Sequence, residues 1–298
     1  KRFRVEGQVR SACLFSSGLG YQKIVVNGQE VEDRYMDPAF SEYEKRAYYA
    51  VFPELADYFQ EGENCLAIQV ATGWRAPENV CYKLTGMIPA YVGETQLSAV
   101  LRLEYEGGHV RWIYTDPSWR YQYGPIRRSN IFDGEIYDAS YTLRDWGCIA
   151  GKPAEKPVRI LPAPGQKLMP QTLEPVKNQE IYSAISVSRI QPGVWSVDFG
   201  QNIAGVCRLR LPSPLSAGQK ITISHMEFLN EDGTLFLDPL RNAACVDQYI
   251  ASGDERDLTV WEPRFTYHGF RYAQITGLPE PLKKEDIWTV SRYTDIGT

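Results

Sequence analysis

Short β-type segments that end at proline or glycine constrain this chain more than any other feature. Its 298 residues include 19 prolines and 24 glycines, and the runs between them are rich in Val, Ile, Tyr, Phe and Thr. These residue types are enriched in strands. The periodicity of an amphipathic helix is almost missing, with short helical candidates only at Pro53–Phe59 and in the first half of Glu42–Ala50. The pattern predicts an all-β fold of packed antiparallel sheets.

Several turns can be placed from their residue types. Asn27–Gly28 joins two β-type runs and predicts a type I′ hairpin, because both residues tolerate the positive φ angles of that turn. A second hairpin is expected between Leu97–Tyr105 and Val110–Tyr114, which flank a Gly-Gly pair. Asn230–Gly233 predicts a longer turn, and Phe265–Ile275 reads as one more strand.

Proline density divides the chain into two parts. Residues 148–176 contain six prolines, and each proline would remove a hydrogen-bond donor from a central strand. We interpret this stretch as a Pro-rich linker between two antiparallel β-sandwich domains of jelly-roll type, residues 1–147 and 177–279. Residues 280–298 then hold one more possible short strand.

Composition excludes some partners. The formal net charge is −5 and no basic tract stands out, so we expect no nucleic-acid partner. The longest stretch without a charged residue, Ser11–Gln22, is shorter than the roughly 20 residues that cross a bilayer, so no membrane partner is expected. The six cysteines lack a Cys-x-x-Cys pair and favour a reducing compartment. We therefore expect a cytoplasmic protein, although the chain begins at Lys1 as an excised piece would, which leaves export open.

Familiar catalytic templates are missing from the sequence. It contains neither a Gly-x-Ser-x-Gly elbow nor a phosphate-binding Gly-x-x-x-x-Gly-Lys loop. His225 and Glu227 would share one face of a strand, where a cross-strand pair is expected in preference to a metal site. His268 lies among aromatic residues and is interpreted as a structural histidine.

A more informative group surrounds Gly134. Asp133 and Glu135 would point the same way in an extended chain, and the glycine between them permits close approach of backbone or ligand. Two converging carboxylates repel unless a cation, an arginine or hydroxyl donors lie between them. The pair therefore predicts either a sugar or calcium site, or a structural turn neutralised by Arg127 and Arg128.

A second candidate follows a predicted strand at Trp74. An exposed tryptophan on a loop provides a flat apolar surface on which a sugar ring can stack, and Arg75, Asn79 and Tyr82 would supply polar contacts. The alternative is a tryptophan that closes the end of the sandwich.

In its motifs the chain resembles the N-terminal, non-catalytic half of bacterial α-L-rhamnosidases. The matching segments follow one another through most of the sequence, and the series is far more specific than any single motif. They are Val9–Phe15, Leu19–Gly28, Gly62–Leu66, Gly73–Trp74, Ile131–Ala139, Val197–Gly205, His225–Glu227, Glu231–Leu235, Leu240–Arg241 and Trp261–Tyr272.

The resemblance implies two β-sandwiches that precede an (α/α)6 catalytic barrel, and a parent enzyme that hydrolyses terminal α-L-rhamnose with inversion. The first sandwich is similar to jelly-roll carbohydrate-binding modules, some of which hold rhamnose beside calcium. The resemblance thus implies a rhamnose-containing glycan as partner. It also implies sugar contacts and possible calcium ligands; the tentative sugar-binding residues are Trp74, Arg75, Asn79, Tyr82, Asp133 and Glu135, of which Asp133 and Glu135 would also bind calcium.

The sequence departs from the family at its end. Ile287–Thr298 resembles the strand before the barrel, and no long amphipathic helices follow. Inverting hydrolysis needs a carboxylic acid and a carboxylate base, and neither has a matching position, so no catalytic residue is assigned. We expect an accessory region without hydrolytic activity. The alternatives are a working rhamnose- or calcium-binding module and a stand-alone β-sandwich interaction protein.

Overall fold

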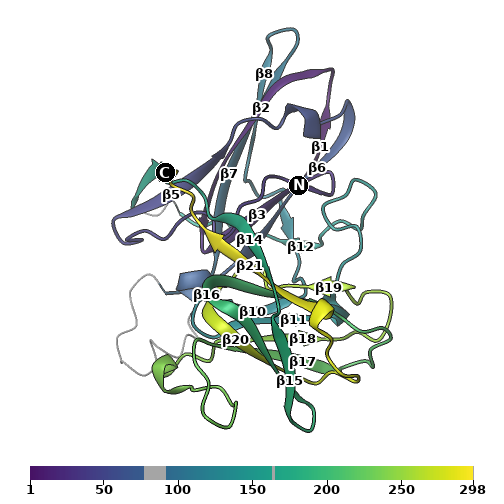
Figure 1. Ribbon diagram of the computed structural model, residues 1–298. Helices are drawn as coiled ribbons and strands as arrows, with labels where there is room; N and C mark the ends of the chain where they lie inside the picture. The colour runs from purple at the N-terminus through teal and green to yellow at the C-terminus, as the bar shows by residue number, and fades with distance from the viewer. Residues whose placement is uncertain (77–91, 163–164, 298) are drawn as a thin grey trace. The chain divides into compact units, whose positions relative to one another are not determined.

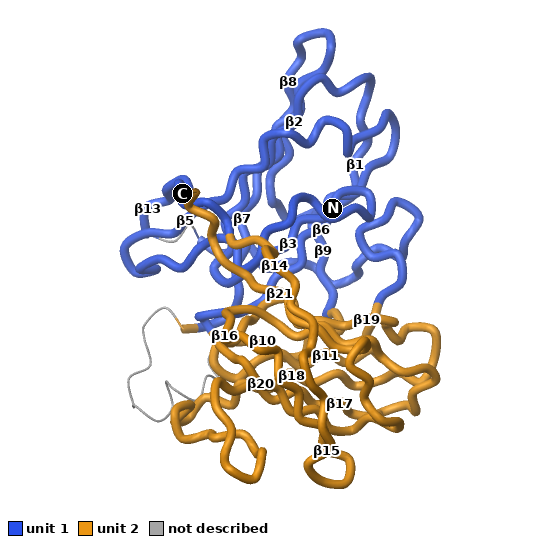
Figure 2. Tube along the Cα trace, viewed as in Figure 1, with its two compact units in different colours: residues 1–75, 93–123, 143–175 blue, residues 76–92, 124–142, 176–298 orange. Residues whose placement is uncertain are grey.

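The chain divides into two units (Figures 1 and 2). Each unit has its own hydrophobic core. A computed structural model describes residues 1–76, 92–162 and 165–297. Within them, strands and loops are interrupted only by short 3-10 helices, which confirms the predicted all-β class. None of the helices in the described part of the chain has the length and apolar character needed to span a membrane.

Unit 1 is a β-sandwich of a four-stranded and a five-stranded sheet, in the orders β1-β6-β3-β4 and β13-β5-β2-β7-β8. Strands β9 and β12 form a separate two-stranded sheet. The elements of unit 1 are β1 (Arg2–Val5), β2 (Val9–Leu19), β3 (Tyr21–Val26), β4 (Gln29–Glu30), β5 (Arg46–Phe52), η1 (Ala56–Tyr58), β6 (Gly62–Ala71), η2 (Gly73–Arg75), β7 (Gln96–Tyr105), β8 (Val110–Tyr114), β9 (Arg120–Tyr121), β12 (Lys156–Pro157) and β13 (Lys167–Pro170).

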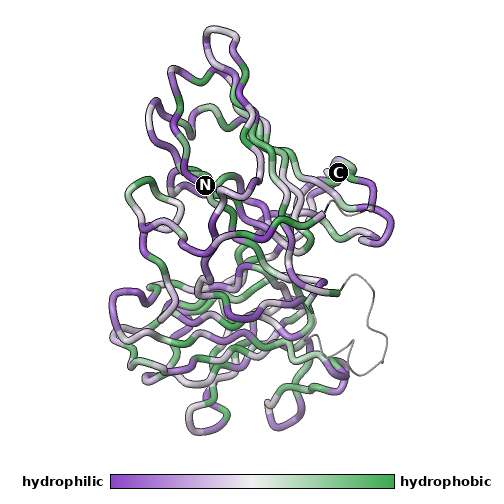
Figure 3. The backbone as a smooth tube through the Cα atoms, turned by 180° about the vertical axis from the view of Figure 1, so that it is seen from behind, coloured by the Kyte–Doolittle hydropathy of each residue, from purple (hydrophilic) through white to green (hydrophobic). Residues whose placement is uncertain are grey.

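Alternation along the strands builds the core of unit 1. On β7, Leu101 and Leu103 are fully buried, whereas Arg102 between them is partly exposed. This two-residue period sends one set of side chains between the sheets and the other outward. Figure 3 shows hydrophobic and hydrophilic residues following one another closely along the chain. Apolar side chains from both sheets therefore meet in one cluster.

The expected hairpins form. Asn27 and Gly28 have φ angles of 52° and 86°, both positive as a type I′ turn requires, and Val26 pairs with Gln29 across the turn. The second predicted hairpin is β7 with β8. The longer turn predicted at Asn230–Gly233 is closed by an isolated bridge between Leu229 and Leu235 instead of a second full strand.

Unit 2 contains one large, strongly bent sheet, in the order β10-β11-β18-β17-β20-β16-β21-β14, with β15 and β19 paired to β16. Strand β16 runs through both halves of this sheet, so that the sheet folds over a common core. The elements of unit 2 are β10 (Ile126–Asn130), β11 (Gly134–Asp138), η3 (Ala139–Tyr141), β14 (Lys177–Ser183), β15 (Ser186–Gln191), β16 (Val194–Arg210), β17 (Lys220–Met226), η4 (Asp238–Leu240), β18 (Val246–Ile250), β19 (Val260–Trp261), β20 (His268–Thr276), η5 (Lys284–Asp286) and β21 (Ile287–Tyr293).

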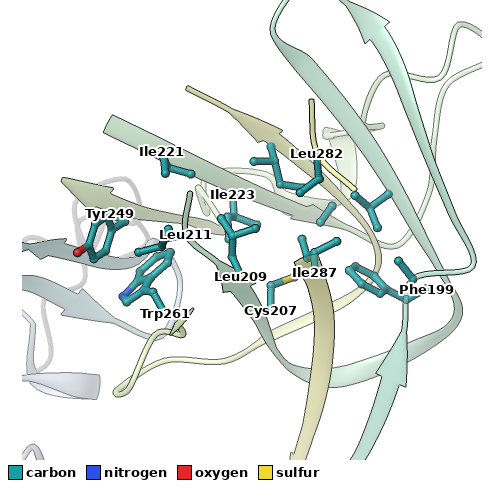
Figure 4. Close-up of a cluster of buried hydrophobic side chains, with 14 of the residues drawn as sticks. Phe199, Cys207, Leu209, Leu211, Ile221, Ile223, Tyr249, Trp261, Leu282 and Ile287 are labelled. Atoms are coloured by element: carbon teal, nitrogen blue, oxygen red, sulfur yellow. The ribbon is translucent and has the colours of Figure 1, made fainter. Parts of the chain in front are cut away.

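The core of unit 2 is rich in aromatic and β-branched side chains (Figure 4). Trp261, Tyr249 and Phe270 are almost completely buried and stand among isoleucines and leucines from several strands. Burial of each such side chain contributes about 1.5–3 kcal/mol relative to exposure. Unit 2 therefore has a hydrophobic core of its own.

Two segments depart from the domain boundaries expected from the sequence. The hairpin β10–β11 belongs to unit 2, because β11 pairs in parallel with β18. The Pro-rich stretch expected to be a linker belongs to unit 1, where β13 adds to the edge of the sheet beside β5. An edge strand tolerates proline because one side of its backbone needs no ladder partner. The high proline density therefore indicates an edge strand of the sheet. The pairing of β11 with the distant β18 has no local signal in the sequence.

Candidate functional site

The residues predicted to contact sugar lie in both units. Trp74 and Arg75 belong to η2 of unit 1, whereas Asp133 and Glu135 belong to the β10–β11 hairpin of unit 2. Asn79 and Tyr82 lie outside the described residues. The contacts of the two sets are therefore taken separately.

Arg75 is buried and forms hydrogen bonds at the end of η2. Its guanidinium donates a hydrogen bond to the backbone oxygen of Glu94 at 3.2 Å, and its own backbone oxygen accepts from the N–H of Gly93 at 3.0 Å. Burial lowers the pKa of this guanidinium below its ordinary value. Arg75, with only 7% of its surface exposed, therefore holds η2 against residues 93 and 94.

Trp74 lies in an aromatic group with Phe40 and Tyr43, which come from a different segment of unit 1. Its ring centroid lies 5.1 Å from that of Phe40, which in turn makes an edge contact with Tyr43. Trp74 is partly exposed and Phe40 is exposed. Aromatic faces of this kind can pack on the C–H face of a sugar ring.

Asp133 is held by the turn in which it stands. Asn130 Oδ1 accepts hydrogen bonds from the backbone N–H groups of Phe132 and Asp133, and Asn130 Nδ2 donates to Asp133 Oδ2 at 3.0 Å. Asp133 Oδ1 faces the N–H of Ala244 at 3.4 Å. Both oxygens of this buried carboxylate are thus directed at donors of the protein itself.

Gly134 permits the close approach that the sequence predicted, and the approaching group is backbone. Its φ is +94°, and a Cβ atom there would lie 2.3 Å from the backbone oxygen of Val246. This contact places the hairpin directly against β18. A side chain at this position would force the two strands apart.

Glu135 is completely buried and acts on the neighbouring loop. Its Oε2 accepts hydrogen bonds from the N–H groups of Arg264 and Phe265, each at 3.0 Å. Burial raises the pKa of Glu135 to about 7, against the opposing effect of the hydrogen bond from Phe265. Such a pKa resembles that of a general acid, but a side chain with no exposed surface cannot reach a glycosidic oxygen.

The arginine pairing expected for this turn is wrong. Among the described residues neither Asp133 nor Glu135 forms an ion pair with an arginine. Amide donors bind both oxygens of Asp133 and the Oε2 of Glu135, whereas the buried Glu135 Oε1 has no hydrogen-bond partner among these residues. Arg127 stacks over the ring of Tyr141 at 4.0 Å. The structural turn itself does form.

The largest concentration of buried titratable groups is a triad of His225, Asp247 and His268. The Nε2 of His268 donates to Asp247 Oδ2 at 3.0 Å, and the Nε2 of His225 lies 3.7 Å from the same oxygen. Asp247 Oδ1 accepts from the backbone N–H of Glu135 at 2.8 Å. All three side chains have no exposed surface, so the triad links β17, β18 and β20 to the hairpin from inside.

The two imidazoles of the triad carry different charges. Burial lowers the pKa of His268, but the Asp247 carboxylate more than offsets this and raises it to about 10. Burial and the charge of His268 lower the pKa of His225 to about 3. At neutral pH, therefore, a protonated His268 pairs with an ionised Asp247, and a neutral His225 stacks beside them.

The triad brings three ligand-type atoms within 4.8 Å of one another, the only such group of metal-ligand side chains in the part of the chain that the structure describes. Its rings, however, are stacked, with centroids 4.3 Å apart and planes 21° apart. Two imidazoles on one tetrahedral ion diverge from it and have centroids roughly 5 Å apart. The geometry is that of a hydrogen-bonded ion pair, which agrees with the structural role expected for His268.

Asp247 was missed from the sequence. Its strand alternates between partly exposed and buried residues, and Asp247 falls in phase with the buried Tyr249. A charged residue in the inward phase of a strand is rare without a partner. The inward phase of Asp247 could therefore have indicated a buried, paired carboxylate. Its partners could not be identified, because the two histidines are distant in sequence.

The two β-rich units define an all-β protein with sandwich architecture, and two family models together match most of the chain. Residues 7–180 match the α-L-rhamnosidase N-terminal domain, and residues 188–292 match the bacterial α-L-rhamnosidase concanavalin-like domain. The chain belongs to the α-L-rhamnosidase family and corresponds to its N-terminal and concanavalin-like domains.

Individual relatives agree with this assignment. An α-L-rhamnosidase of Streptomyces avermitilis is 33% identical over 91% of the chain, which covers 26% of that protein. The solved α-L-rhamnosidase structure from Dictyoglumus thermophilum superposes with a TM-score of 0.89 at 30% identity, over 99% of this chain and 32% of that one. The Streptomyces avermitilis enzyme complexed with L-rhamnose also gives 0.89 at 30% identity, over 99% and 28%. The chain thus spans about a third or less of the length of these relatives.

Proposed function

We propose that the chain is the accessory, non-catalytic β-sandwich region of an α-L-rhamnosidase whose parent hydrolyses terminal α-L-rhamnose from glycans or glycosides. The carrying observation is that the chain aligns over almost its whole length with only about a third of such enzymes, and that its family matches are their N-terminal and concanavalin-like domains. A carboxyl pair for inverting hydrolysis must flank the bond from two sides of a water-accessible site. The carboxyls that the sequence singled out, Asp133 and Glu135, are instead buried and held by amides.

The partner in this proposal is the helical catalytic domain of the parent chain. Support comes from exposed apolar side chains in unit 2, because exposed apolar surface of this kind is typical of interaction sites. They include Ile181, Ile185, Leu237 and Tyr293, of which Ile181 is 61% exposed. A second proposed contribution is carbohydrate contact through the aromatic group of Phe40 and Trp74 in unit 1.

The proposal is tested with the purified chain and an aryl α-L-rhamnoside. We expect no release of the aryl alcohol above the buffer blank. Titration calorimetry with L-rhamnose, with and without calcium, then measures the binding contribution. A Trp74→Ala variant that abolishes the heat supports the aromatic group, and an Asp133→Ala variant that removes a calcium dependence would support the buried turn as an ion site.

A further inference from the structure

Strand β16 carries a wide irregularity that opens the surface of unit 2. Asp198 pairs with Tyr272 and Ile203 pairs with Phe270, so the four residues 199–202 of β16 face a single residue, Arg271, on β20. Extra residues of this kind re-aim side chains and often lie beside functional sites. Here the irregularity presents Asn202 at the surface, next to the end of β17.

A hollow of about 490 Å³ lies at this place and is lined by polar and apolar groups together. Asn202 Nδ2 donates to Glu227 Oε1 at 2.7 Å, and the guanidinium of Arg271 forms two hydrogen bonds of 2.8 Å with Asp198. The Arg271 charge is therefore balanced, while Glu227 adds a negative charge to the wall. The remaining carboxylate oxygen, amide oxygen and guanidinium N–H groups offer acceptors and donors on one wall.

Apolar surface completes the hollow. Phe228 is 58% exposed, and it lines this hollow together with Leu229 and Tyr272. The same Phe228 and Leu229 line a second hollow of about 510 Å³, which continues over the turn that carries Phe236. Phe228 thus stands between two adjoining depressions, each large enough for a ligand group.

The strands around the hollow are joined by pairing and by the buried triad. Strands β16 and β17 both pair with β20, and the triad joins β17 and β20 to β18 through His225 and His268. Glu227 directly follows the last residue of β17, and the hydrogen bond from Asn202 orients its carboxylate. A carboxylate that is already oriented loses little freedom when a ligand binds.

We infer that this hollow, lined by Asn202, Glu227, Phe228 and Arg271, binds a neutral pyranose ring of a glycan, with a second ring in the adjoining depression. Vicinal hydroxyl groups donate to the Glu227 carboxylate and accept from Asn202 and Arg271, while the C–H face of the ring packs on Phe228. The net negative wall disfavours uronates and phosphates. The inference rests on the proposed function, because it gives the glycan of that function a place on unit 2.

The test uses the purified chain and two-dimensional amide NMR spectra at millimolar sugar. The probes are L-rhamnose, a disaccharide of α-L-rhamnose linked to D-glucose, and D-glucuronate as the anionic comparison. We expect shifts at residues 202, 227–229 and 271–272 with the disaccharide, smaller shifts with rhamnose and none there with glucuronate. Shifts confined to the loop of Trp74, or no shifts with any sugar, would overturn the hollow, whereas hydrolysis of an aryl rhamnoside would instead overturn the proposed function.

Matched variants sharpen the test. Glu227→Gln keeps the size of the side chain and removes the charged acceptor, so we expect disaccharide affinity to fall about tenfold or more. Phe228→Ala removes the stacking face, with an expected loss of about three- to tenfold. The controls in the same unit are Glu285→Gln and Tyr141→Ala, both at exposed positions away from the hollow. Equal affinity in Glu227→Gln and Glu285→Gln would contradict the inference.

Discussion

Replacement of Asp247 by asparagine removes the one negative charge that balances the buried triad. Both Asp247 and His268 have no exposed side-chain surface, and their atoms are 3.0 Å apart. Loss of one partner of a buried ion pair costs about 3–5 kcal/mol, because the remaining charge stays desolvated. The raised pKa of His268, about 10, gives the same magnitude. With an ordinary imidazole at about 6.5, it corresponds to roughly 4 kcal/mol at neutral pH.

The sign of this contribution follows from the raised pKa. The stabilisation is complete below the pKa of an unfolded histidine and is lost as pH rises through about 10. Asp247 works in the other direction: two imidazoles lower its pKa despite burial, so its contribution is lost only at strongly acidic pH. The full effect of Asp247→Asn is therefore expected at about pH 5–6, and most of it is still present at neutral pH.

Urea unfolding followed by tryptophan fluorescence measures the change, since Trp261 lies in the core of the same unit. With a slope of about 2–3 kcal/mol per molar urea, we expect the midpoint of Asp247→Asn to fall by about 1–2 M. Asp286→Asn is the control, because Asp286 pairs with Arg210 at the surface at 3.4 Å and such pairs contribute about 1 kcal/mol or less.

A double-mutant cycle separates the pair from the rest of the triad. Asp247→Asn combined with His268→Asn should cost clearly less than the sum of the two single variants, because neither charge is then left alone. Asp247→Asn with the same midpoint as Asp286→Asn, or strictly additive single variants, would refute the account of a buried ion pair.

Two further predictions concern the β10–β11 hairpin. The pKa of Glu135 is raised to about 7 in the folded protein, so the folded state binds the proton of this carboxyl more tightly than the unfolded state does. Ionisation of Glu135 therefore destabilises the fold as pH rises from about 4.5 through 7. Between about pH 5 and pH 8, the unfolding free energy of Glu135→Gln should rise by about 2–3 kcal/mol relative to that of the wild type. A difference in unfolding free energy that stays constant across this range would show that burial does not raise the pKa of Glu135. Gly134→Ala should cost about 2–4 kcal/mol, since its Cβ would meet the backbone oxygen of Val246. Gly218→Ala, with a similar positive φ and open space around it, should cost only about 1 kcal/mol, and equal losses in thermal unfolding would exclude the close approach as the cause.

Much of the fold follows from local rules. The Asn27–Gly28 turn, the β7–β8 hairpin and the alternation on β7 arise from neighbouring residues, and the sequence predicts each of them. The parallel pairing of β11 with β18 joins residues more than a hundred positions apart, and no local pattern encodes it. The assignment of the hairpin to unit 2 therefore had to come from the structure.

Some residues of the candidate site could be predicted from the sequence, but their hydrogen-bond partners could not. Asp133, Gly134 and Glu135 stand out in sequence because two carboxylates flank a glycine, and the structure places all three in one tight turn. Their partners are backbone amides, which no sequence pattern identifies. Calcium binding, sugar contact at Trp74 and a cytoplasmic location stay predictions.

The most direct test of the accessory role is hydrolysis of para-nitrophenyl α-L-rhamnoside by the purified chain. The full-length Streptomyces avermitilis relative, assayed at the same molar concentration, provides the positive control. We expect nitrophenol release by the control and none above the blank by this chain, at any pH where the chain is folded. Turnover by the chain that survives repeated purification would contradict the accessory role, because two sandwich domains would then contain the acid and the base themselves.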